Sequence, residues 1–294
     1  MDISSDKHLT FSIKMVIKHS MRIMMSLNRK LKKSVLKKFF KEVFFQFNIV
    51  ENPYHNVHHT FEVLQMTTYL IRLLINQNIL SEEDKTLLQV AAICHDHRHG
   101  GISNSEWDIN SVASIRSSFN SMTSIDEDVR HMHKTSYNEI LHVCSSVDIV
   151  HKYKDTLFPS LSLRYVDETF TNLILSTDIE HHHQYMNDIC INQVSNRKKS
   201  LMTLIIKLAD VSHVMRPFNI HLFWVYKLIS EIRSNGMVRD MDSYEFVAED
   251  TLFFVQNYVQ PLLKMFVEHN CIAECDILDN YCANIKTWQA YIKN

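Results

Sequence analysis

The scarcity of glycine and proline constrains the fold of this chain more than any other feature of its sequence. The 294 residues include only 3 Gly and 4 Pro. Folds built from β-strands need these residues at their many tight turns, whereas helices need them mainly at their ends. Apolar residues make up 46% of the chain, which is enough to build a core. We therefore expect an all-α protein in one compact multi-helix domain.

Charge and cysteine usage exclude several classes of protein. The net charge of -2 provides no overall field that would mark a nucleic-acid binder. The six cysteines form no C-x-x-C pair, which is typical of reduced thiols in the cytoplasm. No apolar segment of a signal peptide follows Met1, and no window reaches the roughly 18 uncharged apolar residues of a membrane span. We expect a soluble cytoplasmic protein.

The first 45 residues form a basic segment. Lysines and arginines alternate there with Met, Ile, Leu, Val and Phe, a pattern that predicts amphipathic helix. Such a helix can pack its apolar side on the domain, or it can make a peripheral contact with an anionic membrane. We favour packing, because solvated charged faces are common. The predicted division is a basic segment at residues 1–45 and one helical domain at residues 46–294.

Several local patterns predict where helices lie. Residues 61–75, FEVLQMTTYLIRLLI, are apolar on nearly every side and suit a buried helix. Ser81 and Asp84 match a capping box at the start of the next helix. Residues 117–135 are polar and weakly periodic, which predicts a loop or a frayed segment. Pro261 interrupts the last long apolar stretch and should kink it.

Histidines gather at the polar ends of two apolar helices. In NPYHNVHHTF, His55 and His59 would lie one turn apart on one helical face, with His58 close to that face, so spacing alone does not choose between His58 and His59. In ICHDHRHGG, the adjacent His95 and Asp96 offer a nitrogen and an oxygen ligand, and the carboxylate could bridge two metal ions. The alternative is a set of structural histidines and a salt-bridged pair at a capped helix end.

Two more aspartates follow apolar helices. Asp210 ends LIIKLAD, where a buried carboxylate is costly without a partner. A metal ion would compensate it, and so would a salt bridge to Lys207 or Arg216. Asp178 follows ILST at the end of another apolar helix. The joint order His-x-x-x-His, His-Asp-x-x-His, Thr-Asp and Ala-Asp is far more specific than any of its parts.

In this order, about residues 40–270 resemble the class I 3',5'-cyclic nucleotide phosphodiesterase catalytic domain, a branch of the HD metallohydrolases. NPYHNVHHTFEVLQM and AAICHDHRHGG look most like the cGMP-preferring members. The resemblance implies an all-α HD-type fold that hydrolyses cAMP, cGMP or both to 5'-nucleoside monophosphates. A hydroxide activated by two divalent metal ions would attack the phosphorus, and a histidine would act as general acid. The partner would be a small-molecule cyclic nucleotide; neither the base preference nor the oligomeric state follows from the sequence.

The resemblance also assigns roles to individual residues. His55 would protonate the leaving ribose oxygen, a task that suits an imidazole. Zn²⁺ would be held by His59, His95, Asp96 and Asp210. Asp96 would also contact a second ion, Mg²⁺ or Mn²⁺, whose other ligands are mostly waters. Those waters would be steadied by His99, Thr177 and Glu139, with Asp178 one layer further out. The nucleotide would lie against Tyr54, His213, Thr251 and Phe254.

The sequence departs from the family where the base would bind. The family normally has Asn at the position of His213, and a purine-anchoring Gln at the position of Thr251, three residues before the clamp Phe254. A hydroxyl cannot offer the paired donor and acceptor of an amide. The segment between Gly236 and Thr251 is also shorter than usual, which implies a trimmed loop over the substrate.

These departures leave three functions to compare. Because each hydrogen bond left unmade costs about 1–3 kcal/mol, we expect cyclic nucleotide hydrolysis with weak affinity and loose base preference. The first alternative is an HD-type phosphohydrolase that acts on another phosphoester. The second is a catalytically weak pseudoenzyme that binds nucleotide.

Overall fold

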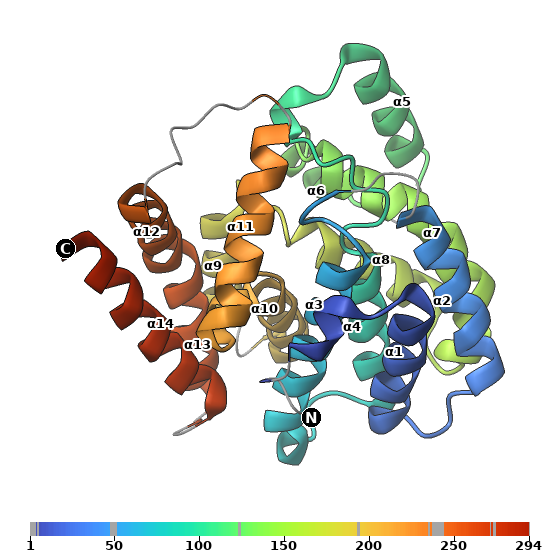
Figure 1. Cartoon of the computed structure of the whole chain (residues 1–294). Helices are drawn as coiled ribbons and strands as arrows, with labels where there is room; N and C mark the ends of the chain where they lie inside the picture. The colour runs from blue at the N-terminus through green and yellow to red at the C-terminus, as the bar shows by residue number, and fades with distance from the viewer. Residues whose placement is uncertain are drawn as a thin grey trace.

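The computed structural model describes residues 4, 6–47, 52–122, 125–192, 195–234, 236, 244–270, 272 and 275–293 (Figure 1). Within these ranges the chain is helical and has no strand, so the predicted all-α fold is confirmed. The α-helices are α1 (Ile13–Leu27), α2 (Lys33–Phe47), α3 (Val57–Leu73), α4 (Glu82–Cys94), α5 (Ile109–Asn120), α6 (Glu127–Met132), α7 (Tyr137–Leu157), α8 (Leu163–Leu175), α9 (His182–Ile191), α10 (Arg197–Asp210), α11 (Phe218–Ser234), α12 (Tyr244–Phe254), α13 (Gln260–Asn270) and α14 (Asp276–Lys293). Shorter helical turns are η1 (Lys7–Thr10), η2 (Ile75–Gln77), η3 (Asn104–Glu106), η4 (Ser212–Met215) and the π-helical η5 (Val255–Val259).

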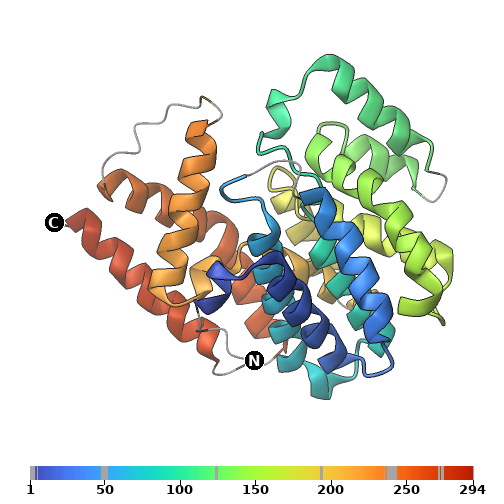
Figure 2. The same cartoon turned by 45° about the vertical axis from the view of Figure 1, so that its right-hand side comes forward.

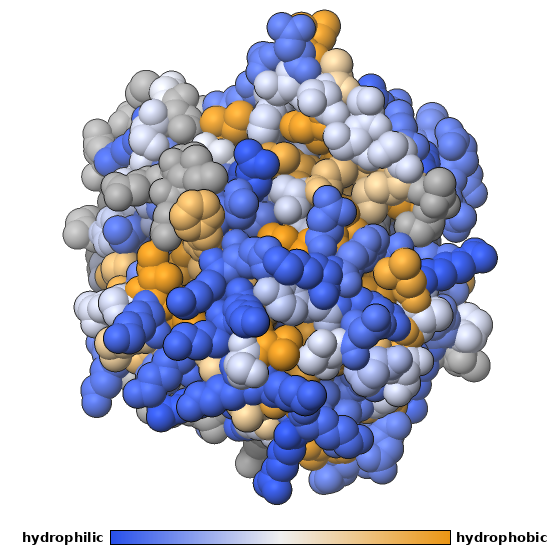
Figure 3. All heavy atoms as spheres, turned by 90° about the vertical axis from the view of Figure 1, so that its right-hand side faces the viewer, coloured by the Kyte–Doolittle hydropathy of each residue, from blue (hydrophilic) through white to orange (hydrophobic). Residues whose placement is uncertain are grey.

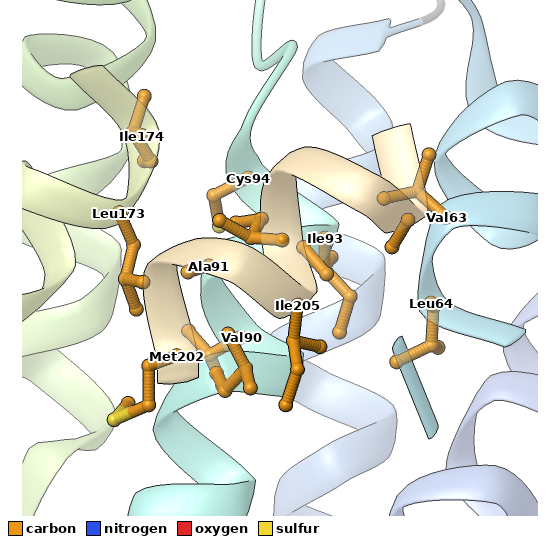
Figure 4. Close-up of a cluster of buried hydrophobic side chains, with 14 of the residues drawn as sticks. Val63, Leu64, Val90, Ala91, Ile93, Cys94, Leu173, Ile174, Met202 and Ile205 are labelled. Carbon is orange, nitrogen blue, oxygen red and sulfur yellow. The ribbon is translucent and has the colours of Figure 1, made fainter. Parts of the chain in front are cut away.

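The main core surrounds α4. Figure 4 shows side chains from α3, α8 and α10 pointing toward those of α4. All of the labelled side chains are buried: Val63, Leu64, Val90, Ala91, Ile93, Cys94, Leu173, Ile174, Met202 and Ile205. Burying one aliphatic side chain of this size stabilises a fold by about 1.5–3 kcal/mol. The packing of these apolar helices fixes where their polar ends lie, and those ends carry the candidate ligands.

Two of the local predictions are confirmed. The predicted buried helix at residues 61–75 coincides with α3 up to Leu73, and most residues of this helix are buried. The capping box starts α4, since the Asp84 N–H donates to Ser81 Oγ at 3.0 Å and the Ser81 N–H donates to Asp84 Oδ2 at 3.1 Å. Both features depend on residues close in sequence, which is why sequence patterns find them.

The prediction of a loop or a frayed segment at residues 117–135 is wrong where two helices form. Helix α5 continues to Asn120, and α6 forms a further short helix within that range. Phe119 and Ile125 are buried, and Arg130 of α6 donates to the Phe119 carbonyl at 2.7 Å. Burial of apolar side chains and the hydrogen bond from Arg130 therefore stabilise helices that the weak periodicity of this segment does not predict.

Pro261 lies at the second residue of α13, directly after the π-helical turn η5. Proline lacks an N–H and its ring clashes with the carbonyl four residues earlier, so an unbroken α-helix would be strained there. The wider π-helical turn accommodates Pro261 between α12 and α13. The chain departs from regular α-helix beside this proline, and the predicted kink stays a prediction.

The apolar sides of the basic N-terminal helices are buried inside the protein. Val16 and Met24 of α1 and Phe39, Phe40 and Val43 of α2 are buried in the main core. Figure 3 shows a largely hydrophilic face on the side of the molecule where Figure 1 places α2. This packing favours the surface-helix interpretation over membrane contact. No helix in the described ranges is long and apolar enough to span a bilayer.

The boundary between residues 45 and 46 stays a prediction. It falls in the last turn of α2, which ends at Phe47. The described cysteines, Cys94, Cys144, Cys190, Cys275 and Cys282, are free thiols, as their spacing predicts.

The last helices form a second, smaller core. Val225 and Ile229 of α11 pack against Val247, Ala248 and Leu252 of α12 and Trp288 of α14. Figures 1 and 2 both show α11, α12 and α14 together on the left, apart from α1, α2 and α7 on the right. The candidate site uses residues from both groups of helices. Half of the shortened segment predicted between Gly236 and Thr251, residues 237–243, lies outside the described residues.

Candidate active site

The start of α3 separates the two histidines that sequence spacing placed on one helical face. The side chain of Asn56 accepts hydrogen bonds from the backbone N–H groups of His58 at 2.8 Å and His59 at 3.2 Å. This N-cap begins the helix at Val57. His55 therefore precedes the helix, which corrects the expectation of a shared face. The two rings of His55 and His59 still lie near each other, with centroids 6.0 Å apart.

His55 is held by a glutamate from a distant helix. Glu231 of α11 contacts Nδ1 of His55 through one carboxylate oxygen, and its other oxygen accepts the backbone N–H groups of Tyr54 at 2.8 Å and His55 at 3.0 Å. Burial alone would lower the pKa of His55, but the Asp96 charge and the hydrogen bond to Glu231 outweigh it and raise that pKa above its ordinary value. The ring also stacks on His99, with centroids 3.8 Å apart. The site thus favours a protonated imidazole in a fixed orientation.

Two histidines and two aspartates converge on one point. The Nε2 atom of His95 lies 3.1 Å from both Asp96 Oδ2 and Asp210 Oδ1. The Nε2 atom of His59 lies 3.3 Å from Asp210 Oδ1 and 3.4 Å from Asp96 Oδ2. The ligand atoms of His59, His95 and Asp210 all lie within 4.8 Å of one another. These four side chains come from the ends of α3, α4 and α10, which the main core brings together.

The donor set fits a divalent metal ion. Nδ1 of His95 lies 3.0 Å from the Ala92 carbonyl and donates to it, so a neutral His95 directs an unprotonated Nε2 at two carboxylates. Asp96 Oδ2 is also buried, and it faces Nε2 of both His59 and His95. Against the effect of burial, the Asp96 and Asp210 charges raise the pKa of His95 well above its ordinary value. Lone pairs and anions that converge in this way are stabilised by a shared cation, and two nitrogens with carboxylate oxygens match the ligands of zinc and similar ions.

His58 is turned away from this cluster. Its Nδ1 atom lies 3.3 Å from the backbone carbonyl of His8 in η1. Of the two candidates that spacing left open, the structure brings only His59 to the aspartates.

A second group of polar side chains lies beside the cluster. Nδ1 of His99 accepts the Gly101 N–H at 2.9 Å, and Glu139 accepts a hydrogen bond from the Asn104 amide at 3.1 Å. Asp178 accepts the Glu180 N–H at 2.8 Å and contacts Ser136. Burial and the charge of Asp178 raise the pKa of Glu139 to about 8. A carboxylic acid of this kind can donate a hydrogen bond at neutral pH.

One cavity of ≈ 330 Å³ unites most of the predicted site, a size typical of small-ligand pockets. Its lining includes Tyr54, His55, Asp96, His99, Glu139, Thr177, Asp210, His213, Thr251 and Phe254. Its apolar wall comes from α11 and α12, and includes Val225, Leu228, Ile229, Ile232 and Val247. His59 and His95 are buried beneath its floor, and Asp178 lines an adjoining cavity.

Residues 54–273 match the 3'5'-cyclic nucleotide phosphodiesterase family, and this stretch contains every side chain of the cavity. The chain belongs to this family. A cGMP-specific 3',5'-cGMP phosphodiesterase of Dictyostelium discoideum is 30% identical over 190 residues, which cover 61% of this chain and 38% of that protein. A dual 3',5'-cyclic-AMP and -GMP phosphodiesterase of Plasmodium falciparum is 24% identical over 270 residues, 84% of this chain and 23% of that protein.

The fold is also that of solved phosphodiesterase domains. The phosphodiesterase domain of a rhodopsin fusion protein from the choanoflagellate Salpingoeca rosetta superposes with a TM-score of 0.77 at 19% identity, covering 99% of this chain and 95% of that domain. The chain covers only 38% and 23% of the two curated relatives named above, so its likeness to them concerns one part of their length.

Sequence patterns missed two residues of this candidate site. Glu231 lies 176 residues from His55, and nothing nearby distinguishes it from a solvated glutamate at a helix end. His142 is 1% exposed, and its ring lies 5.4 Å from that of His99, with Nε2 4.0 Å from Asp96 Oδ1. Its position three residues after Glu139, on the same face of α7, is a sequence feature that could have found it.

A side chain joins the two histidine segments of the candidate site. The Asn52 amide donates to the carbonyls of His99 at 2.7 Å and His55 at 3.2 Å. Gly101 lies beneath it with a φ of 77°, and a Cβ at that position would come within 2.7 Å of Asn52 Oδ1. Glycine is therefore required there both for its backbone conformation and for space.

Proposed function

We propose that this chain hydrolyses 3',5'-cyclic nucleotides to 5'-nucleoside monophosphates. The observation that carries the proposal is the convergence of His59, His95, Asp96 and Asp210 beside a histidine of raised pKa. The two aspartates and that histidine, His55, line one cavity. A reaction that expels a ribose alkoxide needs a proton donor at the leaving oxygen and stabilisation of charge at phosphorus. Family membership and the names of the relatives support the same chemistry.

His55 would supply the proton to the leaving ribose oxygen. Its Nδ1 is occupied by Glu231, so Nε2–H is the group available to a substrate in the cavity. The raised pKa keeps this proton in place near neutral pH. Tyr54 and Phe254 would flank the nucleotide, and the apolar wall from α11 would exclude water from its base.

Two divalent ions complete the proposal. Zn²⁺ would be held by His59, His95, Asp96 and Asp210, and Mg²⁺ or Mn²⁺ would share Asp96. Bound there, the ions would supply a nucleophilic water of lowered pKa and neutralise the charge that gathers on the phosphoryl oxygens. His99, Glu139 and Thr177 would orient the waters of the second site. Burial and the charge of Asp178 raise the pKa of Glu139, which would keep it protonated.

The test is hydrolysis of cAMP and cGMP side by side, with Mg²⁺ or Mn²⁺ added. His55→Ala and Asp210→Ala are measured beside the wild-type chain. We expect turnover of at least one nucleotide in the wild type, and its loss in both variants. Retained turnover in both variants would overturn the assignment of the acid and the ligand.

The altered base pocket favours one further candidate. Thr251 lines the cavity in place of the amide that usually anchors a purine, so another phosphoester could be the substrate of the same metal cluster. Assaying a panel of phosphomonoesters and phosphodiesters distinguishes this candidate from hydrolysis of cyclic nucleotides. Faster turnover of a non-cyclic ester than of either cyclic nucleotide would favour this candidate, and metal-dependent binding without turnover would indicate a pseudoenzyme.

A further inference from the structure

Three side chains from three elements form a hydrogen-bonded chain that ends at the base pocket. His213 of η4 lines the cavity, and its Nδ1 lies 2.9 Å from Nδ1 of His221 in α11. Trp288 of α14 completes the chain, with its indole Nε1–H donating to Nε2 of His221 at 2.7 Å. His221 and Trp288 are both fully buried. We call these three residues the His213 relay.

The hydrogen bonds of the His213 relay can be donated in only one direction, from Trp288 toward His213. An indole N–H can donate but cannot accept, so Nε2 of His221 is an acceptor and carries no proton. A neutral His221 therefore has its proton on Nδ1 and donates it to His213. Nδ1 of His213 is then an acceptor as well, which leaves the proton of a neutral His213 on Nε2. Burial lowers the pKa of His213 to about 4 and that of His221 well below its ordinary value, so both rings are neutral at pH 7.

The relay is anchored to its surroundings. The Asn284 amide of α14 donates to the backbone carbonyls of Val214 at 2.7 Å and Arg216 at 2.8 Å, which ties the segment that carries His213 to the helix that carries Trp288. Among the described residues, His213 uses only Nδ1 for hydrogen bonding, and that atom faces the buried His221. Because His213 lines the cavity, we infer that the opposite edge of the ring, with Nε2–H, is available to a ligand there.

We propose that His213 is a base-selecting residue, a fixed N–H donor that favours a purine whose facing edge presents acceptors. This proposal rests on the proposed function. Guanine presents O6 and N7, both acceptors, whereas adenine presents N7 beside an N6 amino donor. A donor in the pocket matches guanine and opposes the amino group of adenine. The site therefore takes 3',5'-cGMP in preference to 3',5'-cAMP, in place of the loose base preference expected from Thr251 alone.

The difference from an asparagine at this position is physical. An amide can turn by half a rotation and offer either its oxygen or its amino group, so it accommodates both purines. His213 cannot turn in this way without breaking its bond to His221. One buried hydrogen bond made or left unmade changes affinity by about tenfold, which is the preference we expect in kcat/KM.

The test compares cGMP, cAMP and 3',5'-cyclic IMP as substrates. Cyclic IMP keeps O6 and N7 but lacks the 2-amino group of guanine, so it isolates the edge that His213 would contact. We expect cyclic IMP to resemble cGMP, with cAMP about tenfold poorer in kcat/KM. Trp288→Phe removes the indole N–H that fixes which nitrogens of His221 and His213 carry protons. It should therefore lower the ratio of kcat/KM for cGMP to kcat/KM for cAMP. Phe218→Leu removes an aromatic contact with Trp288 but keeps the His213 relay, so it should leave this ratio of kcat/KM values unchanged.

Two further measurements do not depend on turnover. Long-range proton–nitrogen NMR spectra report which nitrogen of His213 carries the proton, with His213→Asn to identify the signal; we expect Nε2–H in the wild type and a mixture in Trp288→Phe. Calorimetric binding of 5'-GMP and 5'-AMP reports base selection directly. A proton on Nδ1, or tighter binding of 5'-AMP, would overturn the inference. No hydrolysis of any cyclic nucleotide with 5'-GMP still preferred would refute the proposed function and leave the inference standing.

Discussion

Replacing Glu231 with glutamine tests the proposed acid more directly than replacing the acid itself. The carboxylate of Glu231 contacts Nδ1 of His55 and accepts two backbone N–H groups, and its side chain is only 4% exposed. A hydrogen bond to a charged group contributes about 1.5–3 kcal/mol, more than a neutral one. Losing the charge destabilises the imidazolium of His55 by about this amount, which corresponds to a roughly 10- to 100-fold lower kcat/KM on the alkaline side of neutrality.

The sign of the pH effect follows from the raised pKa of His55. Its protonated form is present below that pKa and is lost as pH rises through it, so activity falls on the alkaline side. Without the Glu231 charge the pKa of His55 drops, and the alkaline limb of the kcat/KM profile moves to lower pH. Glu231→Asp keeps the charge and serves as the matched control. An unchanged alkaline limb in Glu231→Gln, with normal folding by circular dichroism, would refute the reasoning.

Three other changes have expected outcomes. Asp210→Asn removes a converging carboxylate, so we expect lower zinc content by elemental analysis and at least about 100-fold slower turnover, whereas retained zinc would contradict the ligand assignment. Thr251→Gln restores the amide of the family and should lower KM for a purine nucleotide by about tenfold, and an unchanged KM would mean that Thr251 does not face the base. Gly101→Ala brings a Cβ against Asn52 at a φ of 77° and should destabilise the fold by about 1–3 kcal/mol, seen as a lower Tm in thermal unfolding; an unchanged Tm would show that Asn52 can move aside.

Much of the fold could be predicted because its determinants are local. The capping box of Ser81 and Asp84 joins residues three apart, and the apolar run of α3 shows its burial in its own composition. The prediction for residues 117–135 was wrong because the contacts that stabilise helix there are not local. Helix α6 is short, and contacts from Arg130 to the end of α5 hold the two together.

The sequence by itself determined the helical class, the family resemblance and the histidines and aspartates that could bind metal. Their types and spacing carry that information, since each lies at the polar end of an apolar helix. Spacing left His58 and His59 open, and the resemblance favoured His59. The tertiary structure supplies the physical reason, because an N-cap at Asn56 and a contact to His8 set the directions of the two side chains.

The tertiary structure alone also paired Glu231 with His55, and His221 and Trp288 with His213. These partners lie on α11 and α14, which pack together through a second core far along the chain from α3. No local pattern marks a glutamate or a tryptophan for such a partner. The protonation of a histidine depends on burial and on the charges around it, and both exist only once the helices have packed.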